Sequence, residues 1–225
     1  MRSLFRFVIA VLLSLLGPLP YGYATDTAAF PPMFGAGETR GADMRAFGKW
    51  LDALRRERID AGSYDEDCEN RSPDCLRCDW RRLIASLHGR SRLEQLSSVH
   101  SFMNARRWVD DRVNYGIGDY WATPLEFLAR GGDCEDYAFA KYISLRRLGL
   151  PVEAIRLLVL NDLNAGQPHA VLLVHLDGQV WVLDNLAPTI VRSTSIRHFE
   201  PIYSINELGW WLHRPTPQEQ RLARR

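Results

Sequence analysis

The chain has 225 residues, with 28 Lys or Arg against 27 Asp or Glu, so the formal net charge at pH 7 is +1. This length accommodates one domain of about 150–200 residues with a full hydrophobic core. The near-neutral charge and the absence of a long basic run in the body of the sequence argue against a nucleic-acid partner.

The first 24 residues have the pattern of a secretory signal peptide. Arg2 and Arg6 form a basic start, and residues 7–16 form an apolar run that is too short to span a bilayer. The small residues Gly22 and Ala24 suit cleavage after Ala24. We therefore expect a periplasmic or otherwise exported protein, with an uncleaved membrane anchor as the alternative.

The next segments divide into a leader, a domain and a tail. Residues 25–42 are rich in Gly, Pro and Ala and are predicted to form a flexible leader, whereas residues 43–214 form the folded domain. Apolar residues recur at helical spacing from Met44 to Leu54, which predicts an amphipathic helix. Residues 215–225 are polar and basic and are predicted to be a flexible tail.

Three of the four cysteines cluster in a polar, turn-rich segment, residues 59–79, which is predicted to be an irregular loop. An exported protein favours one disulfide among Cys68, Cys75 and Cys78, although the spacing does not say which two pair. The alternative is a zinc site completed by His88, but the spacing is not that of a standard zinc finger.

Two helix-start signals follow. Ser91-Arg92-Leu93-Glu94 is a capping box that opens a predicted helix reaching Trp108, with His100 on or near its apolar side as a core residue. Thr123-Pro124-Leu125-Glu126 is a second capping box and opens a short helix that ends at Gly131-Gly132. Trp121, just before this helix, either walls a site or belongs to the core.

The segment that follows these glycines contains a candidate catalytic cysteine. Apolar spacing predicts a helix from Cys134 to Leu148, with Cys134 in its first turn. There the helix dipole and free N–H groups lower a thiol pKa, and the Cys134 N–H is placed to stabilise an oxyanion. The neighbouring Asp133, Glu135 and Asp136 oppose this by like-charge repulsion. Either a cation such as Ca²⁺ binds these acids, or they only complement the dipole.

A hairpin locates two possible partners for the thiol. Residues 152–160 are predicted to form a strand, and two further strands flank Asp177-Gly178, a strong two-residue turn signal. Counting back from this turn places Val171 opposite Asp184, which makes His169 the diagonal neighbour of Asp184 on one face.

An acid among apolar strand residues needs a partner, and His169 provides one for Asp184. Taken alone, the pair is better explained as a structural contact within a strand. Together with Cys134 it forms a catalytic triad, in which Asp184 fixes the tautomer of His169 and His169 activates the thiol.

Several motifs resemble those of the bacterial transglutaminase-like cysteine peptidases, and in particular the LapG-type periplasmic peptidases. They are Tyr120-Trp121-Ala122-Thr123-Pro124-Leu125-Glu126-Phe127-Leu128, Gly131-Gly132-Asp133-Cys134-Glu135-Asp136, Ala140-Lys141-Tyr142, His169 and Trp181-Val182-Leu183-Asp184-Asn185. The resemblance spans roughly residues 43–211. The cluster of Cys68, Cys75 and Cys78 has no counterpart in the pattern.

The resemblance implies an α+β, papain-like fold in which the helix bearing the cysteine packs on an antiparallel sheet bearing His and Asp. It implies calcium dependence, with Asp133, Glu135 and, less directly, Asp136 as ligands. It also implies cleavage of a large surface adhesin near its N-terminus beside paired alanines, which disperses biofilm. An inner-membrane cyclic-di-GMP receptor is the implied inhibitory partner.

Two other functions stay open on the sequence. Transglutaminases use the same triad to transfer an acyl group to an amine, so hydrolysis and transfer are not separable from the residues. A non-catalytic binding module with a vestigial triad is the other alternative, although all three catalytic roles are filled.

Overall fold

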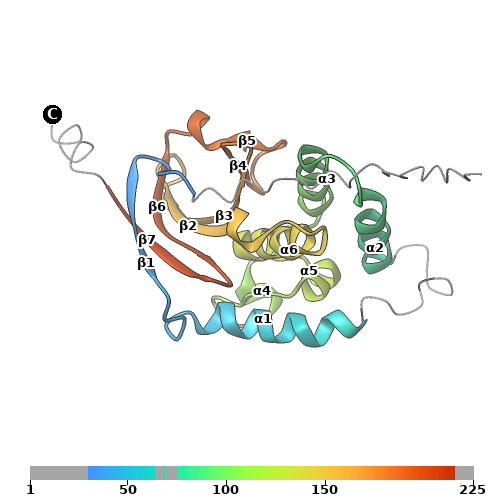
Figure 1. Cartoon of the computed structure of the whole chain (residues 1–225). Coiled ribbons are helices and arrows are strands. Elements are labelled where there is room, and N and C mark those ends of the chain that lie inside the picture. The colour runs from blue at the N-terminus through green and yellow to red at the C-terminus, as the bar shows by residue number, and fades with distance from the viewer. Residues whose placement is uncertain (1–29, 64–67, 69–74, 216–225) are drawn as a thin grey trace, which may run out of the picture.

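The computed structural model describes residues 30–63, 68 and 75–215, and the predicted signal peptide and tail beyond Pro215 lie outside these residues (Figure 1). The elements are β1 (Ala36–Gly41), α1 (Gly48–Asp60), η1 (Ala61–Ser63), α2 (Leu76–Leu87), α3 (Arg92–Asn104), α4 (Asp111–Asn114), α5 (Pro124–Arg130), α6 (Cys134–Arg147), η2 (Val152–Ala154), β2 (Ile155–Asp162), β3 (Gln167–Leu176), β4 (Gln179–Leu183), β5 (Val191–Arg192), η3 (Ser193–Ser195), β6 (Phe199–Asn206) and β7 (Gly209–Pro215).

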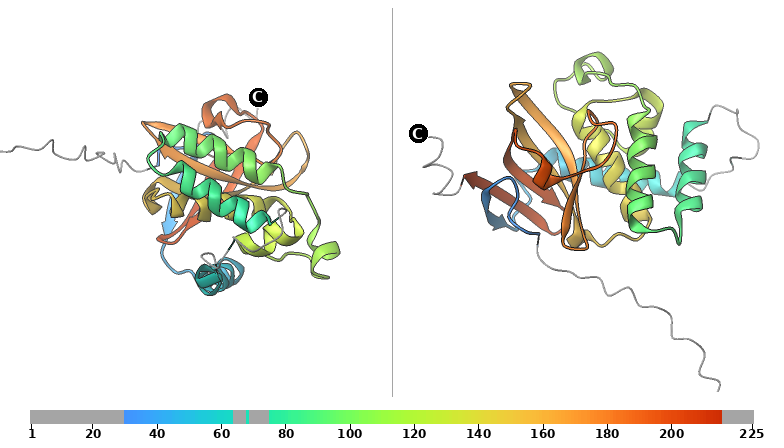
Figure 2. Two further views of the ribbon diagram at one scale, coloured as in Figure 1. Left: turned by 90° about the vertical axis from the view of Figure 1, so that its right-hand side faces the viewer. Right: turned by 90° about the horizontal axis from the view of Figure 1, so that it is seen from above.

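The strands form one antiparallel sheet in the order β1-β7-β6-β2-β3-β4-β5. The α-helices gather on one side of this sheet, as the two further views make clear (Figure 2). The predicted α+β class, with a cysteine-bearing helix on an antiparallel sheet, is confirmed. None of the described helices combines the length and the apolar character that crossing a bilayer requires.

Helix α6 occupies the centre of the helical layer. Its residues from Asp136 to Leu145 are all buried, because β3 lies on one side of the helix and α3 and α5 on the others. The sheet presents alternate side chains to it, including Ile155, Leu157 and Leu172. The predicted helix is confirmed to within one residue, since α6 ends at Arg147 and Gly149 follows with a φ of 78°.

The opposite face of the sheet is covered by residues assigned from the sequence to a flexible leader. Phe30 and Met33 are buried there against Leu158, Val171 and other strand residues. Residues 36–41 then pair with β7 as the edge strand β1. The leader prediction is therefore wrong for residues 30–41, because this segment buries apolar side chains and forms a ladder with a strand near the other end of the chain.

The cysteine-rich segment is better ordered than expected at its end. Cys68 and Cys78 form a disulfide and Cys75 is free, so one disulfide among the three is confirmed, and the zinc alternative fails because two of its ligands are oxidised. Residues 76–79, the end of the predicted loop, instead form the first turn of α2, whose buried face includes Trp80 and Ile84.

One further boundary differs from expectation. The helix that begins after Ser91 ends at Asn104, and Trp108 lies outside it, 57% exposed. Beyond the helix, the backbone turns to form a bridge between Trp108 and Gly132. His100 is buried as predicted, and both capping residues, Ser91 and Thr123, accept the expected backbone N–H.

Candidate active site

The start of α6 is held by the two glycines that precede it. The Val109 N–H donates to the Gly132 carbonyl at 2.9 Å, and the Gly132 N–H donates to the Arg107 carbonyl at 3.3 Å. Gly131 has a φ of 78°, and a Cβ atom there would lie 2.2 Å from the Arg107 carbonyl oxygen. A side chain is therefore excluded where the chain passes residues 107–109 to reach Cys134.

Gly131→Ala is expected to lower the free energy of unfolding by about 3 kcal/mol or more, from the unfavourable φ and the displaced backbone together. Gly149→Ala is the matched control, since Gly149 also has a φ of 78° but a Cβ atom there would have no neighbour within 4 Å. Its expected loss is about 1–2 kcal/mol. Urea unfolding measures both, and equal losses would contradict the steric argument.

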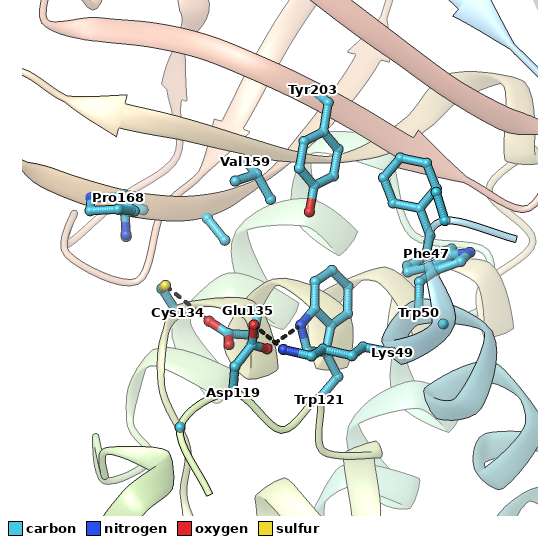
Figure 3. Close-up of a pocket in the computed structure, with 15 residues that line it drawn as sticks. Phe47, Lys49, Trp50, Asp119, Trp121, Cys134, Glu135, Val159, Pro168 and Tyr203 are labelled. Carbon is cyan, nitrogen blue, oxygen red and sulfur yellow. Dashed lines mark hydrogen bonds and ion pairs between the residues drawn. The ribbon is translucent and has the colours of Figure 1, made fainter. Parts of the chain in front are cut away.

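Cys134 and His169 line the same cavity, which has a volume of about 780 Å³. The Ala170 N–H, directly after His169, interacts with the Cys134 sulfur and favours its thiolate. Figure 3 shows the sulfur toward one end of this cavity and the aromatic side chains of Phe47, Trp121 and Tyr203 toward the other. Trp121 is thus both buried and part of the cavity wall.

The contact between His169 and Asp184 is present as the hairpin register predicted. The ladder pairs Leu176 with Gln179 and Leu172 with Leu183, so its extension places Val171 opposite Asp184. His169 Nε2 lies 2.8 Å from Asp184 Oδ1, and both side chains are buried. Because this contact engages Nε2, the other ring nitrogen, Nδ1, is the one left for a proton from the thiol.

The thiol itself is directed at an acid. Cys134 Sγ donates to Glu135 Oε2 at 3.2 Å. Burial raises the pKa of the Cys134 thiol far above its ordinary value, and the charges of Glu135 and Asp133 raise it further. Without a bound cation, burial and the acids together outweigh the lowering effect of the helix terminus on the thiol pKa.

The acids around the thiol include two that the sequence did not single out. Carboxylate oxygens of Asp111, Asp119 and Glu135 lie within 4.8 Å of one another, as do those of Asp111, Asp133 and Asp136. Asp111 is the first residue of α4, and Asp119 follows the turn after that helix. In the sequence, the only sign of these two acids as ligands is the acidic character of the segment before Tyr120. The predicted ligands Asp133, Glu135 and Asp136 are all in or beside this acidic cluster.

The cluster fits a hard divalent cation. Asp111 is 1% exposed, and its Oδ1 atom, like Asp133 Oδ1, is buried without a hydrogen-bond partner among the described residues. Burial and the Glu135 charge raise the pKa of Asp133 to about 9, and burial raises the pKa of Asp111 as well. Converging carboxylates that repel one another, with two buried oxygens that have no partner among the described residues, are donors that Ca²⁺ takes, although the Asp119 carboxylate already pairs with Lys49 and accepts the Trp121 Nε1–H.

Asp136 differs from the other acids because both of its oxygens already hold the backbone. The Ala122 N–H donates to Oδ1 at 2.6 Å, and the Asp133 N–H donates to Oδ2 at 3.2 Å. A Cβ atom on Gly132 would lie 2.1 Å from Oδ2. Asp136 therefore ties the Trp121–Ala122 segment to the start of α6, whether or not it also contacts a metal.

Comparisons with known proteins agree with this arrangement. Residues 59–211 match the family model of the bacterial transglutaminase-like cysteine proteinases. The calcium-bound LapG of Legionella pneumophila is 31% identical, with a TM-score of 0.58, and the match covers 71% of this chain and 87% of that one.

Two further structures of Legionella pneumophila LapG match with the same TM-score of 0.58. One is 27% identical, with 75% of this chain and 91% of that chain covered. The other, EGTA-treated, is 28% identical, with 72% and 86% covered. No curated protein sequence matches the chain.

Proposed function

Because this chain belongs to the bacterial transglutaminase-like cysteine proteinases and is a cysteine peptidase, we propose that Cys134, His169 and Asp184 are its catalytic triad. The observation that carries the proposal is the single cavity that holds Cys134 at a helix start and His169, whose ring is bonded to Asp184 at 2.8 Å. A nucleophile, a base and a group that orients the base are the three parts that thiol catalysis needs.

The proposed reaction follows from which atoms are free. His169 Nδ1 accepts the thiol proton, and the sulfur attacks the peptide carbonyl to form a tetrahedral intermediate, whose oxygen is stabilised by the Cys134 N–H at the start of α6. His169 then gives its proton to the leaving amine, which breaks the C–N bond and leaves an acyl-enzyme. Water, deprotonated by His169, attacks the thioester and releases the carboxylic acid and the thiol.

Hydrolysis and acyl transfer are separated by one incubation. The purified chain is mixed with a peptide substrate and a labelled primary amine, and the products are identified by mass spectrometry. The proposed peptidase yields a free carboxylate at the cleaved bond with no amine attached. Incorporation of the amine as the main product would establish a transferase, the other chemistry open to this triad.

The proposed substrate is a large surface adhesin that is cut near its N-terminus, beside paired alanines, with biofilm dispersal as the result. The proposed location is the periplasm, and the proposed partner is an inner-membrane cyclic-di-GMP receptor that restrains the enzyme. The resemblance of the motifs supports these assignments, as do the signal-like residues 1–24 and the Cys68–Cys78 disulfide, which suits an oxidising compartment.

We propose Ca²⁺ as the cofactor, held by Asp111, Asp119, Asp133 and Glu135. When bound, the ion neutralises carboxylate charge beside Cys134, which favours the thiolate. Among the comparison proteins, LapG of Legionella pneumophila has a calcium-bound form. The buried Asp111 Oδ1, which has no partner within the described residues, is the feature of this chain that supports the same ion here.

Asp111→Asn is expected to weaken calcium binding roughly tenfold or more, because a buried charged oxygen is removed from the donor set. Isothermal titration calorimetry measures the affinity, and the rate at which iodoacetamide alkylates Cys134 gives a second readout. In the unaltered chain, EGTA is expected to slow that alkylation at neutral pH.

Asp110→Asn is the matched control for this variant. Asp110 is the adjacent acid, but its side chain caps α4 by accepting the Arg112 N–H at 2.8 Å, a role that asparagine also fills. Equal calcium affinity in both variants would remove Asp111 from the ligand set. If EGTA does not change the rate of alkylation, the acids do not bind calcium and only complement the helix dipole.

A further inference from the structure

Helix α6 carries a lysine that the proposed catalytic reaction does not use. Lys141 is 0% exposed and lies two turns after Cys134 on the same helix. Full burial of an ammonium group is costly, so a lysine in such a place needs a compensating interaction. Its Nζ atom donates to the Leu183 carbonyl oxygen at 3.3 Å. Lys141 therefore reaches across from the helix to the last residue of β4, immediately before Asp184.

Among the described residues whose charges affect the protonation of Lys141, Asp184 is the one anion. Asp184 favours the protonated form of Lys141, and Lys141 in turn favours the carboxylate form of Asp184. From α3, the buried His100 feels the same positive charge. On α6 itself, the Tyr137 ring lies with its centroid 5.8 Å from Nζ. The positive charge of Lys141 thus acts on Asp184, the acid that orients His169.

Neighbouring groups hold both the backbone and the carboxylate of Asp184. Asn104 Nδ2 donates to the Asp184 carbonyl at 3.1 Å, and the Leu186 N–H donates to Asp184 Oδ1 at 2.9 Å. Lys141 contacts the preceding peptide unit, at the Leu183 carbonyl. Strand β4 ends at Leu183, so Asp184 lies just beyond the strand, where these contacts hold it.

We infer that Lys141 is a positioning residue of the proposed triad: its buried Nζ atom holds the Leu183 carbonyl at the end of β4, and with it the segment from which Asp184 contacts His169. This inference depends on the triad proposed above. Lys141 is not among the residues that line the cavity, so its effect on the reaction passes through Asp184.

The test is Lys141→Met, which keeps the length of the side chain and removes the charge. The expected result is a fall in kcat of about tenfold with KM unchanged, smaller than the roughly 10²–10⁴-fold contribution of a general acid–base group, because Lys141 acts through Asp184. The acid limb of the kcat profile is expected to move to higher pH, because Asp184 loses a cation that opposes its protonation. His169, His100 and Tyr137 remain in place as the other titratable groups around it.

Stability separates positioning from a merely structural role. Burial lowers the pKa of Lys141 to about 7, so the folded chain binds a proton there less readily than the unfolded chain does. The resulting penalty on folding is complete below about pH 7 and fades as the pH rises toward 10.5, the ordinary value. Lys141→Met removes this penalty, so its melting temperature is expected to be at least that of the unaltered chain at pH 6–7.

Ser144→Ala is the matched control on the same helix. Ser144 is fully buried and accepts the Trp80 Nε1–H at 2.8 Å, so its loss is expected to reduce stability and leave kcat unchanged. Lys141→Met with unaltered kcat at every pH, or with melting temperature and kcat reduced together, would overturn the inference. Asp184→Asn is measured alongside, since full activity in that variant would instead reject the triad.

Discussion

Replacement of Cys134 by alanine is expected to abolish peptide-bond cleavage, with a loss in kcat of at least about 10⁴-fold. The reason is that the sulfur forms the covalent bond to the substrate, and the base and oxyanion donor cannot substitute for it. The assay uses an N-terminal adhesin fragment that contains paired alanines, and the cut is located by gel electrophoresis and mass spectrometry. The alanine variant is expected to retain the fold, because Cys134 is only partly buried.

Cys75→Ser is the matched control for this experiment. Cys75 is the other free cysteine among the described residues, and it lies before α2, away from the residues that line the cavity. Its serine variant is expected to cleave at the rate of the unaltered chain. Cleavage by Cys134→Ala at that same rate would reject Cys134 as the nucleophile, whereas loss of activity in both variants would point to a thiol effect outside the cavity.

His169→Ala is expected to lower kcat by about 10²–10⁴-fold, the usual contribution of a general acid–base group. Its ring lies 2.8 Å from Asp184, and its loss also leaves that buried carboxylate without its main partner. His175→Ala is the control, because His175 lies on the same strand but beside the Asp177-Gly178 turn. Equal activity in the two variants would contradict the role of His169.

The same variant has a defined effect on stability. Burial alone would raise the pKa of Asp184, but the hydrogen bond and charge of His169, the Leu186 N–H and Lys141 together lower it below its ordinary value. The carboxylate therefore stabilises the fold above that ordinary value, and the contribution disappears as the pH falls through the lowered one. The stability lost in His169→Ala is expected at neutral pH and to vanish in strong acid, as urea unfolding at several pH values will show.

The sequence predicted the two local features on which the proposed chemistry depends. Residues Asp177 and Gly178 both have positive φ, 50° and 71°, which is the conformation that a two-residue hairpin turn requires. With that turn fixed, strand alternation determines the register, so the His169–Asp184 contact followed from counting alone. The start of α6 was also predictable from nearby residues, because the glycine pair before the helix and Gly149 after it mark the two ends of one apolar repeat.

Features that join distant segments were not accessible in this way. The pairing of β1 with β7 spans most of the chain, and a Gly-rich segment such as residues 30–41 has no periodicity of its own from which an edge strand is predicted. The end of the helix after Ser91 also differs from the prediction. The apolar spacing continues to Trp108, but Trp108 forms a bridge with Gly132, so the backbone there is not helical.

What the sequence alone determined is thus a cysteine at a helix start, the paired imidazole and carboxylate of one hairpin, and the acids beside the thiol, because each depends on one short stretch of the chain. Only the tertiary structure added Asp111 and Asp119 to those acids, directed the thiol toward Glu135, and placed the buried Lys141 beneath Asp184. The physical reason is that burial and convergence of charge depend on how α6, the 107–122 segment and the sheet pack together, and no local pattern records that packing.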